Sequence, residues 1–253
     1  MDAAEIERIK DLLPTSMGSE EIRRNVAADI LRRSVFSARL EDVRHLARIR
    51  DVCTAISAGE INQADARAQL LESLAAMGHS PLDGGGLSNP ASIRRLDLIV
   101  ETQRQMAASV AQLDAQTDAV VAQWPAWRLG RVEERAMPRE DWPARWASAG
   151  DAVGWEGALR GTDMVALKSS PIWQALGDGA GGFRDTLGNP YPPFAYNSGL
   201  DWIDVDAEEC AALGLPTDGA EAPRGATLSP GEREIAEAVK RLGLDLDAVA
   251  EGL

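Results

Sequence analysis

The chain has 253 residues, of which 45% are hydrophobic and 26% are charged, and its formal net charge is −14 at pH 7. This composition is typical of a globular protein with a sizeable core, and the acidic excess argues against general binding to DNA or RNA phosphates. Residues 201–253 carry most of the excess, with 13 acidic and 4 basic residues, and they could dock on a basic protein or simply favour solubility.

Two further absences narrow the class of protein. Cys53 and Cys210 are far apart in unlike contexts, which offers neither a disulfide framework nor a zinc-binding spacing. No run approaches the ~20 apolar residues that span a bilayer, and the first residues lack the apolar segment of a signal peptide. The sequence therefore predicts folding in a reducing cytoplasm, with no membrane partner.

The first 80 residues predict helices joined by short connections. We expect a short helix over residues 2–13, a long one from Ser19 to about Phe36, a third over 40–58 that buries Val43, and a fourth from Asn62 to Gly78. The arginines of the second helix could contact nucleic acid. Acidic residues share that face, however, and a mixed face is typical of a solvated helix.

Three consecutive glycines between two prolines, within residues 79–90, predict a domain boundary. Beyond it we expect a helix over about 91–113, a short one from Asp118 to Trp124, and renewed helix from Trp127 to Arg135. The first of these segments has apolar residues at helical spacing.

The segment 137–150 carries two tryptophans four residues apart, Trp142 and Trp146, which share a face if the segment is helical. Pro143 suits the first turn of such a helix, and Arg145 could stack on the indoles. Tryptophan pairs of this kind usually belong to the core, so we interpret them as structural.

Residues 164–202 combine glycines and prolines with many aromatic side chains, which indicates a compact, specifically folded loop region. Within it we expect a weak strand over 164–167 and a short helix over 171–176. A further short helix over 206–213, a linker over 216–228 and a last helix over about 230–242 complete the chain.

These elements predict a mainly α fold with a small α+β, loop-rich C-terminal core and a helical N-terminal region. Three parts follow from the composition changes: residues 1–80 as the helical N-terminal region, residues 91–215 as the core with its aromatic Gly/Pro loop, and residues 216–253 as a linker with an acidic C-terminal helix.

The search for chemistry yields no catalytic residue and no cofactor. His45 and His79 lack neighbouring ligands at metal spacing, and although a Ser-His-Asp arrangement stays open, no Gly-x-Ser-x-Gly motif supports one. The glycines of 177–182 lack the preceding strand and following helix of a dinucleotide site.

The remaining polar residues have plainer interpretations. Acidic residues between positions 201 and 209 could hold a divalent cation, but they do not match a calcium-binding loop, and surface acids are the better interpretation. Lys168, Arg145 and Glu101 are expected to lie over apolar surface with their charged ends in water.

Four segments occur in an order that resembles the head-morphogenesis proteins of tailed bacteriophages, specifically the minor head proteins of the Mu F-like type. They are SIRRLDLIVETQRQMA (92–107), REDWPARW (139–146), ALKSSPIW (166–173) and GNPYPPFAYNSG (188–199). The resemblance covers roughly residues 90–215, and the loop from Pro192 to Ser198 matches best. It implies a long helix packed on a small α+β core that this loop closes, which is the Mu F-like core assigned to residues 91–215.

The resemblance also implies a function. It predicts a minor capsid protein that binds at the portal vertex and supports head assembly or DNA packaging and delivery. The partners would be the portal protein, other head proteins and, indirectly, packaged DNA, with no small-molecule substrate. The protein would reside in the virion, in the capsid interior or at the portal vertex, and in the host cytoplasm during assembly. The structural and interaction residues are expected to be Trp142, Arg145, Trp146, Lys168, Trp173, Tyr191, Pro192, Pro193, Phe194, Tyr196 and Asn197.

The sequence departs from the family pattern at two places. It has no histidine after position 79, and Ser198-Gly199-Leu200 stands where many members carry Cys-Arg-Cys. A structural role tolerates these changes better than an enzymatic one.

Two other functions remain open: a phage-encoded effector or toxin enzyme, and an adaptor whose acidic C-terminal tail binds a basic partner. The enzyme hypothesis predicts a polar cleft with several convergent titratable groups. The head-protein hypothesis predicts an exposed apolar or charged stripe on the N-terminal helices.

Overall fold

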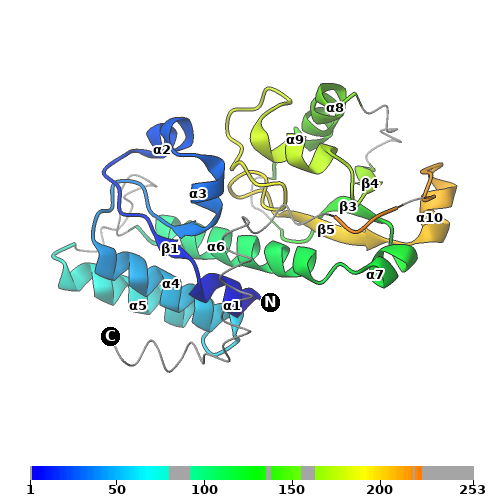
Figure 1. The fold of residues 1–253 in the computed structure, drawn as a ribbon. Helices are drawn as coiled ribbons and strands as arrows, with labels where there is room; N and C mark the ends of the chain where they lie inside the picture. The colour runs from blue at the N-terminus through cyan, green and yellow to red at the C-terminus, as the bar shows by residue number, and fades with distance from the viewer. Residues whose placement is uncertain (1, 80–91, 135–137, 155–162, 219, 224–253) are drawn as a thin grey trace, which may run out of the picture.

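The structure is a computed structural model that describes residues 2–79, 92–134, 138–154, 163–218 and 220–223. In these ranges the chain is mainly α-helical with a small α+β part, as the sequence predicts (Figure 1). Within the described residues, no helix is both long enough and apolar enough to cross a membrane. The predicted boundary at 79–90 lies outside the described residues except for residue 79. The predicted last helix at 230–242 lies wholly outside them.

The N-terminal unit contains five helices and two very short strands. In chain order these are α1 (Ala3–Arg8), β1 (Asp11–Leu12), α2 (Ser19–Asn25), α3 (Ala28–Arg32), β2 (Ser34–Val35), α4 (Val43–Ser57) and α5 (Gln63–Ala76). The sequence predicts the start of α5 correctly, whereas α4 begins at Val43 and not at residue 40. Asp42 accepts the backbone N–H groups of the first turn of α4, and Asn62 does the same for α5.

The single long helix expected from Ser19 to Phe36 is wrong, and so is the full length of the helix expected over 2–13. The backbone turns extended at Val26 and again at β2, which pairs in parallel with β1. That pairing joins segments more than 20 residues apart, and the local apolar spacing carries no information about it. Val43, expected to be buried, is 50% exposed at the first position of α4.

The long helix α6 (Ile93–Asp114) connects the two halves of the molecule (Figure 1). Its first half contributes Leu96 and Val100 to a helical core. Its second half contributes Met106 and Val110 to a separate aromatic core. Because Ile6 of α1 also reaches the aromatic core, the N-terminal unit is packed on the rest of the chain and does not stand apart. The helical core consists of Val35, Leu40, Leu46, Ile49, Val52, Cys53, Ala66, Leu70, Leu74, Leu96 and Val100.

The helix expected from Trp127 to Arg135 is wrong, because this segment forms the central strand of a small sheet. After α7 (Asp118–Gln123), β3 (Ala126–Arg131) pairs antiparallel with β4 (Val165–Leu167) on one side and β5 (Leu200–Val205) on the other. The strand at 164–167 is therefore confirmed, within a residue, whereas β5 was not expected. Strand side chains alternate between faces, so one face of the sheet enters the aromatic core and the other packs on α10 (Ala207–Ala212).

Two helices cover the aromatic side of the sheet, α8 (Trp142–Ala152) and α9 (Ile172–Asp178) (Figure 1). Pro143 lies in the first turn of α8, where its missing N–H costs nothing, as the sequence predicts. Helix α9 ends at Gly179 in a left-handed conformation, which starts the glycine-rich turn that leads into the loop 183–199.

Candidate functional site

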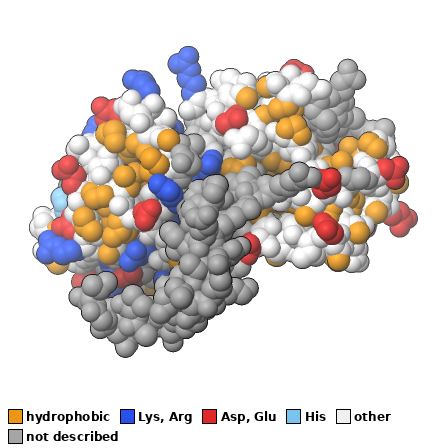
Figure 2. All heavy atoms as spheres, in the orientation of Figure 1, with side chains coloured by type: hydrophobic (Ala, Val, Ile, Leu, Met, Phe, Trp, Pro, Cys, Tyr) orange, Lys and Arg blue, Asp and Glu red, His pale blue; other side chains and the backbone are white. Residues whose placement is uncertain are grey.

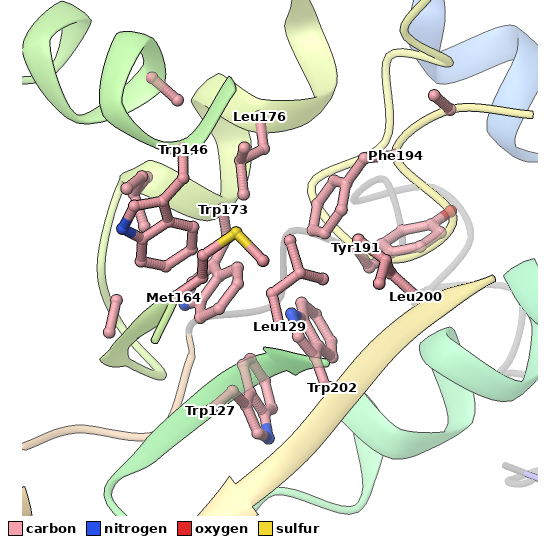
Figure 3. Packing of buried hydrophobic residues seen from close by; sticks show 14 of the residues in the cluster. Trp127, Leu129, Trp146, Met164, Trp173, Leu176, Tyr191, Phe194, Leu200 and Trp202 are labelled. Carbon is pink, nitrogen blue, oxygen red and sulfur yellow. The ribbon is translucent and has the colours of Figure 1, made fainter. Parts of the chain in front are cut away.

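The aromatic core is the centre of the C-terminal half of the molecule. Trp173 on α9 contacts four other rings, with centroid distances of 5.3 Å to Trp146, 5.7 Å to Trp202, 6.0 Å to Trp127 and 6.3 Å to Phe194. Its indole N–H also donates to the backbone carbonyl of Leu167, at 2.9 Å. Figure 3 shows these rings converging from the sheet, from α8 and α9 and from the loop, with Met164 and Leu129 among them.

The loop 188–199 closes this core, and most of it is buried. Tyr191, Phe194 and both prolines of the Pro192–Pro193 pair are inside, and the bond between the prolines is cis. The side chain of Asn189 donates to the Pro193 carbonyl at 3.2 Å, inside the loop. The loop is thus a fixed part of the packing and not a mobile connection.

A close backbone approach joins this loop to α9. The N–H of Gly188 donates to the carbonyl of Gly177 at 2.8 Å. A Cβ atom at position 177 would lie 1.6 Å from the carbonyl oxygen of Asn189, so only glycine fits there. From the other side, Arg32 on α3 donates to the carbonyl of Gly188 at 3.0 Å, which links the N-terminal unit to the loop.

Arg145 holds the turn after α9 against α8. Its buried guanidinium bonds to Asp141 at 2.8 Å and to both carboxylate oxygens of Asp185, at 2.8 and 3.1 Å. It also lies 4.3 Å from the centre of the Phe183 ring, a distance typical of cation–π contact. A bidentate ion pair with a ring stacked on the guanidinium is a rigid arrangement. Arg145 therefore fixes α8 to the turn that follows α9.

Arg139 binds the same carboxylate, which gives Asp185 two cationic partners. Burial by itself would raise the pKa of Asp185, but the hydrogen bonds from Arg145 and then Arg139 outweigh it and lower the pKa to about 2. The carboxylate is therefore ionised throughout the physiological pH range, and this contact does not respond to pH there.

Lys168 is fully buried, contrary to the expectation that its charged end reaches water. Its ammonium group pairs with Asp204 on β5 at 2.7 Å and donates to the side-chain oxygen of Gln116 at 2.8 Å. It also lies 5.2 Å from the centre of the Trp127 ring. These contacts satisfy the charge and join the end of β4 to β5 and to the connection between α6 and α7.

The two ends of this ion pair should respond differently to substitution. Replacing Asp204 by alanine leaves the buried ammonium without its counter-charge and should cost about 2–3 kcal/mol of unfolding free energy. Replacing Lys168 by methionine keeps the volume and leaves Asp204, which is 41% exposed, to water, and should cost less than about 1.5 kcal/mol. Urea unfolding of both variants measures the difference. Equal losses would contradict the claim that the buried ammonium of Lys168 depends on Asp204 as its counter-charge.

The acidic residues of 201–209 are largely committed to local structure. Asp204 pairs with Lys168, Glu209 pairs with Arg128 at 2.6 Å, and Asp206 caps α10. No group of three or more potential metal ligands occurs among the described residues.

The structure also brings His45 and Ser73 together, between α4 and α5. The ring Nδ1 of His45 lies 2.9 Å from the hydroxyl oxygen of Ser73. Asp42 does not complete a triad, because its carboxylate accepts the backbone N–H groups of Arg44 and His45 as the cap of α4. The pair is a contact between two packed helices.

Most of the residues singled out from the sequence meet at the aromatic core. Trp142, Trp146, Trp173, Tyr191 and Phe194 belong to it directly. Pro192 and Pro193 are buried in the loop that closes it. Of the rest, Tyr196 is half-buried, and Asn197 is exposed in a left-handed conformation.

Sequence reasoning missed the importance of Trp127 and of Asp185. Trp127 stacks on Trp202 across neighbouring strands, with ring centres 3.8 Å apart. The alternation of Leu200, Asp201 and Trp202 is a pattern typical of a strand and could have predicted β5. The prolines that precede it predict a loop. No local signal marks Asp185, because its partners lie 40 or more residues away.

Comparison with protein-family models, with curated proteins and with solved structures gave no match.

Proposed function

We propose that the protein is a minor head protein of a tailed bacteriophage, which binds at the portal vertex and supports head assembly or DNA packaging and delivery. The observation that supports this proposal best is the convergence of the four segments that carry the resemblance. They are separated in the chain by connections of 31, 19 and 14 residues, yet each places side chains in one aromatic core.

The contributions of these segments are distinct. The helix of 92–107 supplies Met106, the segment 139–146 supplies Trp142 and Trp146, the segment 166–173 supplies Trp173, and the loop 188–199 supplies Phe194 among others. The long helix α6 packs on a small α+β unit that this loop closes, which is the arrangement that the resemblance implies. The four segments that resemble the family thus pack against one another in a single core. Their packing together supports the resemblance over a chance similarity of unrelated segments.

The docking surface in this proposal lies on the N-terminal helices. Figure 2 shows hydrophobic side chains gathered on one face of the N-terminal unit, with Asp and Glu as well as Lys and Arg around them. Val43, the first residue of α4, is 50% exposed. Arg23 is exposed on α2, where Arg24 pairs with Glu20 at 2.7 Å. An apolar surface bordered by charges of both signs suits a partner whose apolar patch has a rim of mixed charge.

The test is co-expression with the portal protein from the same genome, followed by affinity capture and mass determination. We expect a stoichiometric complex. Val43→Glu should weaken it at least tenfold, since a charge would enter the contact. Ile203→Glu is the matched control, because Ile203 is 41% exposed at the opposite end of the molecule, and it should not weaken the complex. A monomer that does not bind the portal protein in affinity capture would overturn the proposal.

A further inference from the structure

The contact between α4 and α5 contains a buried histidine whose ring, among the described residues, is paired with a neutral hydroxyl and forms no ion pair with a carboxylate. His45 is 1% exposed, and its ring reaches the neutral hydroxyl of Ser73 on α5. The nearest carboxylate, Asp42, already accepts two backbone N–H groups and the guanidinium of Arg44. A proton on the ring would therefore place a positive charge inside the packing, where the carboxylate of Asp42 compensates for the burial only in part.

The other charged groups near His45 make protonation harder still. Arg95 lies on α6 and is itself buried, and its guanidinium donates to Ser37 at 2.7 Å and to the carbonyl of Ala38. His79 follows the end of α5. Burial lowers the pKa of His45 to about 4, Asp42 opposes this shift, and the charges of His79 and Arg95 add to it.

We propose that His45 makes the helical core an acid-sensitive unit: when its ring takes up a proton, the contact between α4 and α5 opens while the aromatic core stays folded. The two cores support such a local opening, because their buried residues form separate clusters joined through α1 and α6. This is a conformational property and is independent of the proposed portal binding.

The sign and size of the effect follow from the linkage between protonation and opening. The ring binds a proton more tightly in the open state, where its pKa returns to about 6.5, than in the closed state. Opening is therefore favoured as the pH falls below about 6.5, and the effect is complete below about 4. Between pH 7 and pH 4 the opening equilibrium should rise on the order of 100-fold.

The two cysteines report separately on the two ends of the molecule. Cys53 is buried in the helical core, and Cys210 is buried between the sheet and α10. A dithiodipyridine reagent reacts with thiols at acid pH, and peptide mass spectrometry after digestion gives the rate at each cysteine in the same sample. Rates are divided by those of the same thiols in the unfolded chain at each pH.

From pH 7 to pH 4 the normalised rate at Cys53 should rise on the order of 100-fold in the native sequence, while that at Cys210 changes less than about threefold. His45→Gln keeps a hydrogen-bonding side chain that does not titrate, and it should remove most of the rise at Cys53. His79→Gln is the matched control and should retain the rise. In the native chain, the proposal is overturned if the rates at both cysteines rise together or if neither rate rises. Among the variants, it is overturned if the rate at Cys53 rises in His45→Gln as it does in the native chain, or if His79→Gln abolishes this rise. The first two outcomes are read on the native protein and do not depend on the folding of a variant.

Discussion

Replacing Trp173 by alanine should lower the free energy of unfolding by about 3–5 kcal/mol, the range for deleting a large buried aromatic side chain. Trp173 is the most connected ring of the aromatic core, in contact with three other tryptophans and with Phe194. The substitution leaves a cavity between sheet, helices and loop, and it removes the hydrogen bond to Leu167. Chemical unfolding followed by far-UV circular dichroism measures the loss.

Two variants separate this packing effect from a general sensitivity to tryptophan loss. Trp173→Phe keeps an aromatic ring and should cost roughly half as much. Trp124→Ala is the matched control, because Trp124 is only partly buried and lies outside the aromatic core, and it should cost less than about 1.5 kcal/mol. If Trp124→Ala costs as much as Trp173→Ala, the aromatic core is not the centre of the fold.

Replacing Gly177 by alanine should have a comparable or larger effect and should prevent normal accumulation of folded protein. The added Cβ would lie 1.6 Å from a backbone oxygen of Asn189, and a backbone group cannot rotate away as a side chain can. The loop would have to leave α9, which opens the aromatic core. We expect a loss of more than about 3 kcal/mol, measured as soluble yield and as the midpoint of thermal unfolding.

Gly130→Ala is the matched control for that substitution. A Cβ at Gly130 would also overlap a neighbour, at 2.5 Å, but the atom that it meets is the terminal carbon of the Ile203 side chain. Ile203 is largely exposed and can adopt another rotamer, so the cost should be below about 1 kcal/mol. Similar losses in the two variants would show that the close approach at Gly177 does not hold the loop.

The elements that the sequence predicts well are those fixed by local chemistry. Asn62 and Asp206 each precede a predicted helix as its expected cap, and each caps that helix in the structure. Pro143 lies in the first turn of its helix for an equally local reason. Capping and proline geometry involve residues within four positions of each other, so a single sequence is enough to find them.

The elements that the sequence does not predict depend on distant partners. Strand β3 was expected to be helical, and its partner β5 begins about 70 residues later in the chain. The end of the helical stretch at Ser34, after α3, coincides with the pairing of β1 with β2. Tertiary pairing overrides local propensity in both places.

The sequence predicts the aromatic core only in part, because one of its contributors lies on a strand that pairs with distant residues. The rings of α8, α9 and the loop stand out as a dense aromatic stretch, and the structure brings Trp146, Trp173 and Phe194 together. The contribution of Trp127 depended on the missed strand. Lys168 was assigned to the surface because a lone lysine usually lies there, and only the fold supplies Asp204 as its partner.

The arrangement of the two cores bears on how the proposed docking would work. Helix α6 runs through both, and Arg32 joins α3 to the loop that closes the aromatic core. A partner bound on the N-terminal helices would therefore act on a unit that is mechanically connected to the loop. Binding there should raise the stability of the whole chain, and not of one half alone.

The most direct test of the proposed role is to purify phage head particles produced by the source strain and to quantify this chain in them by mass spectrometry. Our account predicts a few copies per particle, co-purifying with the portal protein and lost from particles assembled without it. Absence of the chain from complete heads, with normal heads formed after deletion of its gene, would contradict the account.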